Sequence, residues 1–415
     1  MTGKLLSKNF VLLISGQITS LFGNFILKLA LSMYILDITG SPAIFAGILS
    51  LAIVPTILLS PLGGILADRV NRRNLMVALD ALAGISVLCA ALLPSGGHEL
   101  AVICVLLIVL SILGAFETPT VQACIPAILE DGNIIQGNAM VNQAASLSYL
   151  IAPALGGLLY AALGLKPVMY ATVGCFFITA LFECLIKLDS RHARSGKRVL
   201  SIVKEDFILS MRYIFQEQSG ISKMLLFTAF SRFFVMGITI VGLPYIVRTL
   251  LGLGAAYYGA AESMLAIATI AGSVLAGLLA KKINIHNLSF LLASLGFFII
   301  PAGIVFLFPL PSTLKYALTI VLLCGMQIAI SIFSIFAVSY IQQKTPDHFM
   351  GKVMAYTSAI TLCAQPMGQM AYGFLFDKFS GAVHLVFIPT GLAVCAVGLL
   401  SINTFKTMEH NHLSL

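Results

Sequence analysis

The chain has 415 residues, of which 59% are hydrophobic and 10% charged, with a formal net charge of +8 at pH 7. Soluble domains carry about 25% charged residues. The composition therefore excludes a cytosolic globular enzyme, a disordered chain and a disulfide-stapled secreted module. A bilayer-spanning helix needs about 20 apolar residues, so at roughly 35 residues per pass, loop included, this length accommodates about twelve passes. A polytopic membrane protein is predicted.

Long apolar runs predict twelve membrane-spanning helices in two groups of six. The first group covers residues 10–36, 43–66, 74–93, 100–127, 134–162 and 167–187. The second group covers residues 222–247, 256–280, 287–308, 314–341, 350–376 and 383–405. We expect the first helix to be retained, because its run outlasts a signal-peptide core and has no small-residue cleavage pattern.

Basic residues in the connections predict the orientation. With a cytoplasmic N-terminus, 18 of the 24 Lys and Arg residues fall on the cytoplasmic side and four on the outer side. By the positive-inside rule, both termini are then cytoplasmic. This distribution also accounts for the net charge, since the basic residues do not interleave with aromatic platforms. We expect membrane lipid rather than nucleic acid as the surrounding partner.

A polar stretch divides the chain into a six-helix bundle at residues 1–187, a cytoplasmic linker at 188–221 and a second six-helix bundle at 222–415. Apolar residues within the linker recur at three- and four-residue spacing; they are Leu200, Val203, Phe207, Met211 and Ile214. This pattern predicts an amphipathic helix. It lies either on the inner leaflet or under the protein's own cytoplasmic face.

A shift of 213 residues relates the two halves. It carries the loop that begins at Gly64-Ile-Leu-Ala onto the loop that begins at Gly277-Leu-Leu-Ala, and it carries Pro153 onto Pro366. Two landmarks with one offset indicate an internal repeat. Parallel six-helix repeats are typical of transporters that rock about a site at the membrane midplane.

Three segments resemble signatures of the major facilitator superfamily. The loop after the second helix, which reads Gly64-Ile-Leu-Ala-Asp68-Arg69-Val-Asn-Arg72-Arg73, resembles its G-x-L-a-D-r-x-x-r-k/r signature. Ala152-Pro153-Ala-Leu-Gly156-Gly157 resembles the later part of the helix-5 signature of its antiporters. The segment from Gly351-Lys-Val-Met to Pro366-Met-Gly368 resembles the branch of macrolide-efflux and enterobactin-exporter proteins. This resemblance implies an all-α membrane fold of two six-helix bundles.

The resemblance also implies a conformational latch between the two halves at the cytoplasmic side. Its residues are Gly64, Asp68, Arg69, Arg72 and Arg73. The alternative is a solvated cluster that only obeys the positive-inside rule. Lys281 replaces the acid in the second copy of the loop, so one latch of this kind is expected.

Pro153, Gly156 and Gly157 predict a kink in the fifth helix and tight packing against a neighbour. In the family this segment is thought to limit leakage and to favour exchange over uniport. The alternative is ordinary Pro and Gly content of a membrane helix. The sequence departs from the family's antiporters in the fourth helix. Leu110 and Ser111 stand where those antiporters commonly carry an Arg, so proton coupling through such an Arg is excluded.

Charged residues inside the apolar runs are the strongest pointers to a site, because each costs roughly 2.5–3.5 kcal/mol on insertion scales. The candidates are Lys28, Glu117, Arg232 and Glu262. The resemblance implies that helices 1, 4 and 7 line a central cavity, with helix 8 beside it. A partly desolvated carboxyl of Glu117, just before Pro119, could exchange protons near neutral pH or contact substrate. The alternative for Glu117 is a static ion pair.

The remaining polar candidates are weaker. Asn24 and Gln327 are uncharged candidates for the cavity, whereas Asp80 and Glu183 are expected near the membrane interface. The eight cysteines lie inside apolar runs without metal-ligand spacing, which predicts no metal site. No nucleotide-binding phosphate loop and no cofactor motif are present in the sequence.

The predicted function is therefore a monomeric, proton-coupled exporter in a bacterial inner membrane, not an enzyme. It would move a small amphipathic compound, such as a drug or a siderophore, outwards by rocker-switch alternating access. The alternative is an importer or uniporter of a nutrient or lipid on the same fold.

Overall fold

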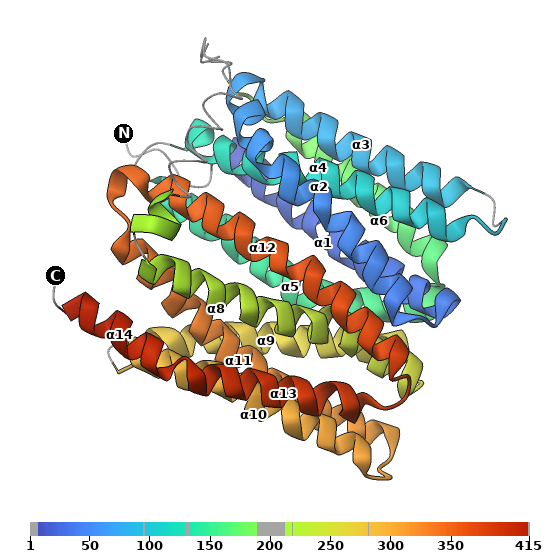
Figure 1. Ribbon diagram of the computed structural model, residues 1–415. Helices are drawn as coiled ribbons and strands as arrows, with labels where there is room; N and C mark the ends of the chain where they lie inside the picture. Colours follow the sequence, from blue (N-terminus) through green and yellow to red (C-terminus); the bar gives the residue numbers. More distant parts are fainter. Residues whose placement is uncertain are drawn as a thin grey trace. The chain divides into compact units, whose positions relative to one another are not determined.

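The computed structural model describes residues 7–93, 96–129, 133–188, 212–217, 219–280 and 282–413, and every regular element in these ranges is helical (Figure 1). The chain divides into two compact units. Unit 1 comprises Met1–Thr39, Ile48–Lys197 and Gly254–Ser263, and unit 2 comprises Gly40–Gly47, Arg198–Leu253 and Met264–Leu415.

Unit 1 is built on six long helices. They are α1 (Lys8–Thr39), α2 (Pro42–Arg69), α3 (Arg72–Leu92), α4 (Glu99–Ile128), α5 (Ile134–Leu163) and α6 (Leu165–Cys184). Helix α1 packs against both α5 and α6, and α3 packs against α4 and α6. Glycine backbones of α1 face α6, where the Thr179 hydroxyl donates a hydrogen bond of 3.1 Å to the Gly16 carbonyl oxygen. Small residues at such crossings allow the close approach that membrane helices use in place of hydrophobic association.

Unit 2 contains α8 (Ser219–Met236), α9 (Ala255–Leu279), α10 (Leu288–Ile304), α11 (Ser312–Lys344), α12 (Asp347–Lys378), α13 (Val383–Leu400) and α14 (Ile402–Leu413). Helix α10 packs on α11 and α13, and α12 packs on α8. A Cβ atom added at Gly296 would lie 2.3 Å from the carbonyl oxygen of Gly391. The close crossing of α10 and α13 therefore requires a glycine at this position.

Two predicted helices differ from the structure. The predicted helix 222–247 is α-helical only to Met236 and continues as π-helical segments Gly237–Gly242 and Tyr245–Leu250. Pro244, between these segments, has no N–H to donate to a regular α-helical ladder. The predicted helix 383–405 ends at Leu400, and α14 starts anew at Ile402.

The predicted amphipathic helix of the linker lies almost entirely outside the described residues. Only Ile214 of its apolar series is described, in the π-helical turn Tyr213–Glu217, where it is buried.

Each unit includes a helix start from the other half of the sequence. Gly254–Ser263, at the start of α9, packs in unit 1, and a Cβ atom at Gly259 would lie 2.3 Å from the carbonyl oxygen of Pro153 on α5. Gly40–Gly47, leading into α2, packs in unit 2. There the Ser41 hydroxyl donates a 2.7 Å hydrogen bond to Asp377 Oδ2 of α12.

Eleven helical segments among the described residues are long and apolar enough to cross a membrane, by length and composition. Helix α12 is 32 residues long but is not among the eleven. Its described part carries polar side chains at helical spacing, which are Thr357, Thr361, Gln365 and Gln369. The all-helical membrane fold expected from the sequence is confirmed.

Candidate functional site

A serine hydroxyl on α1 lies between two carboxyl groups from different helices of unit 1. Ser20 Oγ is 3.0 Å from Asp80 Oδ1 on α3 and 3.3 Å from Glu117 Oε1 on α4. Ser20 and Asp80 are each 1% exposed, and Glu117 is half-buried. A hydroxyl has one proton to donate, so it serves one of the two carboxyl groups at a time.

Glu183 of α6 brings a third carboxyl group to this place. Its side chain is 1% exposed, and neither of its oxygens accepts a hydrogen bond from the described residues. The carboxyl of Asp80 is near enough for a hydrogen bond that forms when one of the two groups carries a proton. Asp80, Glu117 and Glu183 are called the acid cluster below. Buried carboxylates this close repel one another when all are ionised, so the arrangement favours bound protons.

Both Asp80 and Glu183 are fully enclosed among α1, α3, α4 and α6, and their expected place near the membrane interface stays a prediction. For Glu183 the sequence holds a weak signal. Thr172, Phe176, Thr179 and Glu183 follow one another at four-, three- and four-residue spacing, and all four are buried on α6. A single sequence shows this periodicity but does not show which neighbour the face meets.

Four polar residues of α1 form a stripe that begins at the acid cluster and ends at an exposed side chain. At helical spacing they are Gln17, Ser20, Asn24 and Lys28. Gln17 and Ser20 are buried, Asn24 is half-buried and Lys28 is exposed. Gln17 Nε2 and Asn24 Oδ1 are buried atoms without a hydrogen-bond partner among the described residues. The stripe therefore carries unsatisfied polar atoms of Gln17 and Asn24 between the buried Ser20 region and the exposed Lys28.

Lys28 is the basic group that interacts electrostatically with Glu117. It stands two helical turns beyond Ser20 on the same face of α1. Glu117 thus interacts with an exposed ammonium group on one side and two enclosed carboxyl groups on the other. Of the three acids, it is the least buried.

Apolar side chains close the opposite end of the acid cluster. Phe10 and Leu13 of α1, Met76 of α3, and Val121 and Ile125 of α4 are buried in one packed group. Met76 precedes Asp80 by one helical turn, and Val121 follows Glu117 by one turn. This apolar group therefore separates the acid cluster from that end of unit 1.

The segment of α9 that joins unit 1 carries Glu262. The Tyr258 hydroxyl, one turn earlier, donates a hydrogen bond to Glu262 Oε1. Close packing holds this segment on α5, because a Cβ atom at Gly157 would lie 2.6 Å from the carbonyl oxygen of Ala255. Gly156 faces α1, where a Cβ atom would lie 3.2 Å from the Cα atom of Ile26. The predicted helix-5 residues thus stand at the crossings of α5 with α1 and α9.

The two predicted residues of unit 2 form hydrogen bonds between helices of that unit. Arg232 Nη2 of α8 donates to Gln365 Oε1 of α12 at 3.4 Å. Gln327 Nε2 of α11 donates to Thr269 Oγ1 of α9 at 2.9 Å. Ser331 adds a 3.0 Å bond from its hydroxyl to the Thr269 carbonyl oxygen.

The predicted latch is described in part. Gly64, Asp68 and Arg69 are described only as part of helix α2. Arg73 Nη2 donates to the carbonyl oxygen of Cys184, the last residue of α6. Cations favour this position because the terminal carbonyl groups of a helix carry partial negative charge. Arg73 is therefore bound within unit 1, and Arg72 beside it is half-buried.

Comparison with known proteins places the chain in a family. The model of the Major Facilitator Superfamily matches residues 13–364. Macrolide efflux protein A of Streptococcus pyogenes is 23% identical over 408 residues, which cover 95% of this chain and 96% of that protein. The multidrug efflux pump Tap of Mycolicibacterium fortuitum is 22% identical over 412 residues, 94% of each chain. A solved bacterial homologue of the human lysosomal transporter Spinster superposes with a TM-score of 0.74 at 13% identity, covering 99% of each chain.

These matches confirm the resemblance to the macrolide-efflux branch that the signatures indicated. They also confirm a transporter rather than an enzyme, in the bacterial inner membrane and with many membrane-crossing helices. The chain belongs to the Major Facilitator Superfamily.

Proposed function

We propose that this transporter exports a small amphipathic compound in exchange for protons, by rocker-switch alternating access. The proposal includes twelve crossing helices in two bundles, residues 1–187 and 222–415, with both termini in the cytoplasm. The observation that carries it is the Ser20 hydroxyl between Asp80 and Glu117. The efflux functions in the names of the relatives support the outward direction.

The acid cluster supplies the proton site in this mechanism. Glu117 takes up a proton from the outer side and releases it to the cytoplasm, while Asp80 and Glu183 stay enclosed and share a proton. Ser20 donates to whichever carboxyl is ionised, which stabilises the charged form. Lys28 holds the ionised Glu117 until a proton or a cationic group of the substrate replaces that attraction.

The driving force suffices without ATP. One charge that moves inward across about 100 mV contributes about 2.3 kcal/mol. At about 1.36 kcal/mol for each factor of ten, this free energy supports a roughly 50-fold substrate gradient.

Other predicted residues have supporting roles in the proposal. Asp68, with Gly64, Arg69 and Arg72, forms the latch at the cytoplasmic side. Pro153, Gly156 and Gly157 keep α5 packed against its neighbours and limit leakage. Glu262, Arg232, Asn24 and Gln327 are proposed to contact substrate or to tune the coupling. The partners are the substrate, protons and membrane lipid, and the transporter acts as a monomer.

The test uses everted membrane vesicles with an imposed proton gradient, and a radiolabelled macrolide and ethidium as probes. Wild-type vesicles should accumulate a probe and lose it when the gradient collapses, whereas Glu117→Gln should abolish gradient-driven uptake. Glu99→Gln is the matched control, because it alters a carboxyl on the same helix α4 that hydrogen-bonds Tyr34 instead of the acid cluster. Uptake by Glu117→Gln at the wild-type rate contradicts the coupling role. Uptake that runs in the opposite direction supports an importer.

A further inference from the structure

Unit 2 contains a pocket of about 260 Å³ where α9 ends and α10 begins. Its walls are partly apolar, with Ile283, Leu288 and Phe336, and partly polar, with Asn284, Tyr340 and Glu409. Glu409 comes from α14, the last helix of the chain. Mostly apolar walls with a few polar groups are typical of small-molecule sites.

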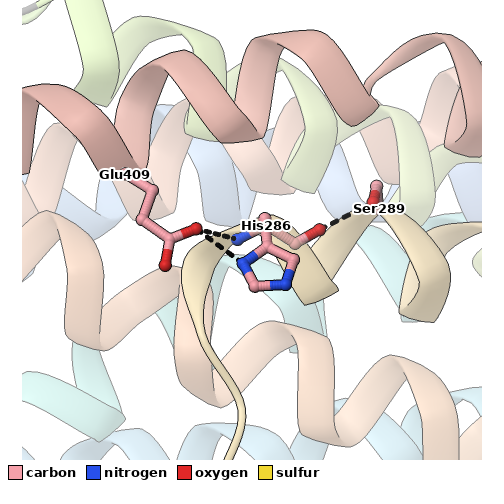
Figure 2. Close-up of polar contacts among 3 residues, drawn as sticks. All are labelled: His286, Ser289 and Glu409. Carbon is pink, nitrogen blue, oxygen red and sulfur yellow. Dashed lines mark hydrogen bonds and ion pairs between the residues drawn. The ribbon is translucent and has the colours of Figure 1, made fainter.

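Glu409 is the acidic residue of this pocket, and a histidine already contacts it. Figure 2 shows Glu409 Oε2 between the backbone N–H of His286, at 3.2 Å, and the ring Nδ1 of His286, at 2.6 Å. The Ser289 hydroxyl donates a 2.7 Å bond to the His286 carbonyl oxygen, which fixes the backbone from the other side. The side chains of His286 and Glu409 remain 36% and 23% exposed, so solvent reaches both.

The chemistry of the walls selects a class of ligand. Glu409 Oε1 takes part in neither contact with His286, and Phe336 and Tyr340 bring aromatic rings to the same pocket. A carboxylate together with aromatic rings attracts organic cations, because the ring faces carry negative potential. The apolar residues accommodate the hydrocarbon part of such a cation.

We propose that this pocket binds an amphipathic organic cation, which Glu409 holds through its charge, and that protonation of His286 competes with it. Doubly protonated His286 neutralises Glu409. Neutral His286 can still hydrogen-bond Glu409, but it does not neutralise the carboxylate, whose negative charge can then attract the organic cation. Histidine is the side chain that ordinarily changes charge between pH 5 and 8, so binding strengthens as the pH rises through that range.

Other titratable groups around Glu409 are few among the described residues. Tyr340 of α11 faces it across the pocket, Lys406 stands three residues earlier on α14, and Lys282 precedes the 3-10 turn that holds His286. Helix α10 has no charged residue, and His384 and Cys395 of α13 do not line the pocket.

The experiment measures binding of benzyltrimethylammonium to the purified full chain by calorimetry at pH 5.5 and pH 8. The probe keeps its charge at both values, so a pH effect belongs to the protein. Wild type should bind about tenfold more tightly at pH 8, because the Glu409 carboxylate that His286 no longer neutralises attracts the cation. Glu409→Gln should lose about tenfold in affinity, and His286→Gln should bind equally at both values.

Controls separate this site from other acids. Glu99→Gln alters the carboxyl of the separate pocket that Tyr34 lines in unit 1, and it should bind the probe as wild type does. His410 and His412 follow Glu409 in the sequence, so the pH series is repeated with both changed to Gln. A pH effect that disappears in that double variant overturns the role of His286.

Three further results overturn the proposal itself. Wild-type affinity in Glu409→Gln excludes Glu409 as the cation site. Equal binding of benzylsulfonate, an anion of similar size, excludes recognition by charge. Loss of binding in Glu117→Gln means that the measured site is the transport site, whereas retention there separates this pocket from proton coupling. Phe336→Leu keeps an apolar side chain and removes the ring, so it should weaken binding of the cation. This variant tests the pocket independently if Glu409→Gln does not fold.

Discussion

Ser20 Oγ of α1 lies 3.0 Å from Asp80 Oδ1 of α3, and the same hydroxyl lies 3.3 Å from Glu117 of α4. One small side chain thereby connects an enclosed acid with a half-buried one. Any change in the charge of Glu117 alters which carboxyl the hydroxyl serves. This relationship makes Ser20 a sensitive position for testing the proton site.

Ser20→Ala should shift the pH dependence of export. The hydroxyl stabilises an ionised carboxyl, so its removal favours the protonated form, and proton release then needs a higher pH. We expect the pH of half-maximal export to rise by about one unit. Vesicle uptake measured between pH 5.5 and 8.5 checks this, with Ser15→Ala on the same helix as control. An unchanged profile for Ser20→Ala would mean that the hydroxyl takes no part in coupling.

Lys28 should be replaceable by Arg but not by Gln. Its proposed role is to hold ionised Glu117 through charge, and Arg keeps that charge on a side chain of similar length. Lys28→Gln should reduce gradient-driven export about tenfold or more, because a charged partner contributes about 1.5–3 kcal/mol. Initial uptake rates at equal protein level provide the measurement. If Lys28→Arg is as inactive as Lys28→Gln, shape rather than charge matters at this position.

Gly157→Ala should destabilise unit 1. The added Cβ atom would lie 2.6 Å from the carbonyl oxygen of Ala255, and backbone cannot move aside cheaply. Overpacking of this kind costs about 1–3 kcal/mol. The melting temperature in detergent should fall for Gly157→Ala and stay unchanged for Gly174→Ala, since nothing lies within 4 Å of a Cβ atom at Gly174. Equal melting temperatures for the two variants would show that the α5–α9 contact relaxes easily.

Asp68→Asn should slow turnover while the protein stays folded. In the proposed latch, the carboxylate stabilises one of two alternating states, so removal of its charge shifts the balance between them. Transport rate and melting temperature are measured on the same preparations, with the neighbouring exposed residue Val70→Ala as control. Full turnover in Asp68→Asn would contradict the latch.

Arg73→Ala should act in the opposite way, chiefly on stability. Its guanidinium group binds the carbonyl oxygen at the end of α6, an interaction of about 0.3–1 kcal/mol at exposed helix ends. We expect a lower melting temperature and partial rescue by Arg73→Lys. Transport per folded molecule should remain near wild type. A large loss of transport with an unchanged melting temperature would instead assign Arg73 to the latch.

The candidates that the sequence offers are residues that stand out locally. Lys28 and Glu117 are charges in long apolar runs, and in the structure they are near enough to influence each other electrostatically; their role in coupling stays a prediction. Asp80 and Glu183 stand closer to the ends of their predicted helices. A charged side chain there costs little insertion free energy, so the sequence predicts that both lie at the interface. Their burial depends on the neighbouring helices, which no single run of sequence specifies.

By itself, the sequence determined the membrane environment, the existence of nearly all the helices and the family, because hydropathy, basic loops and signature motifs are properties of contiguous residues. Only the tertiary structure decided that α1, α3, α4 and α6 enclose three carboxyl groups around Ser20, and that Glu409 meets His286 across 123 residues of chain. It also decided that Gly254–Ser263 packs in unit 1. The physical reason is that apolar helices are hydrophobic on nearly every face, so periodicity does not reveal which face meets which neighbour; close packing at glycines and shared polar groups decide it.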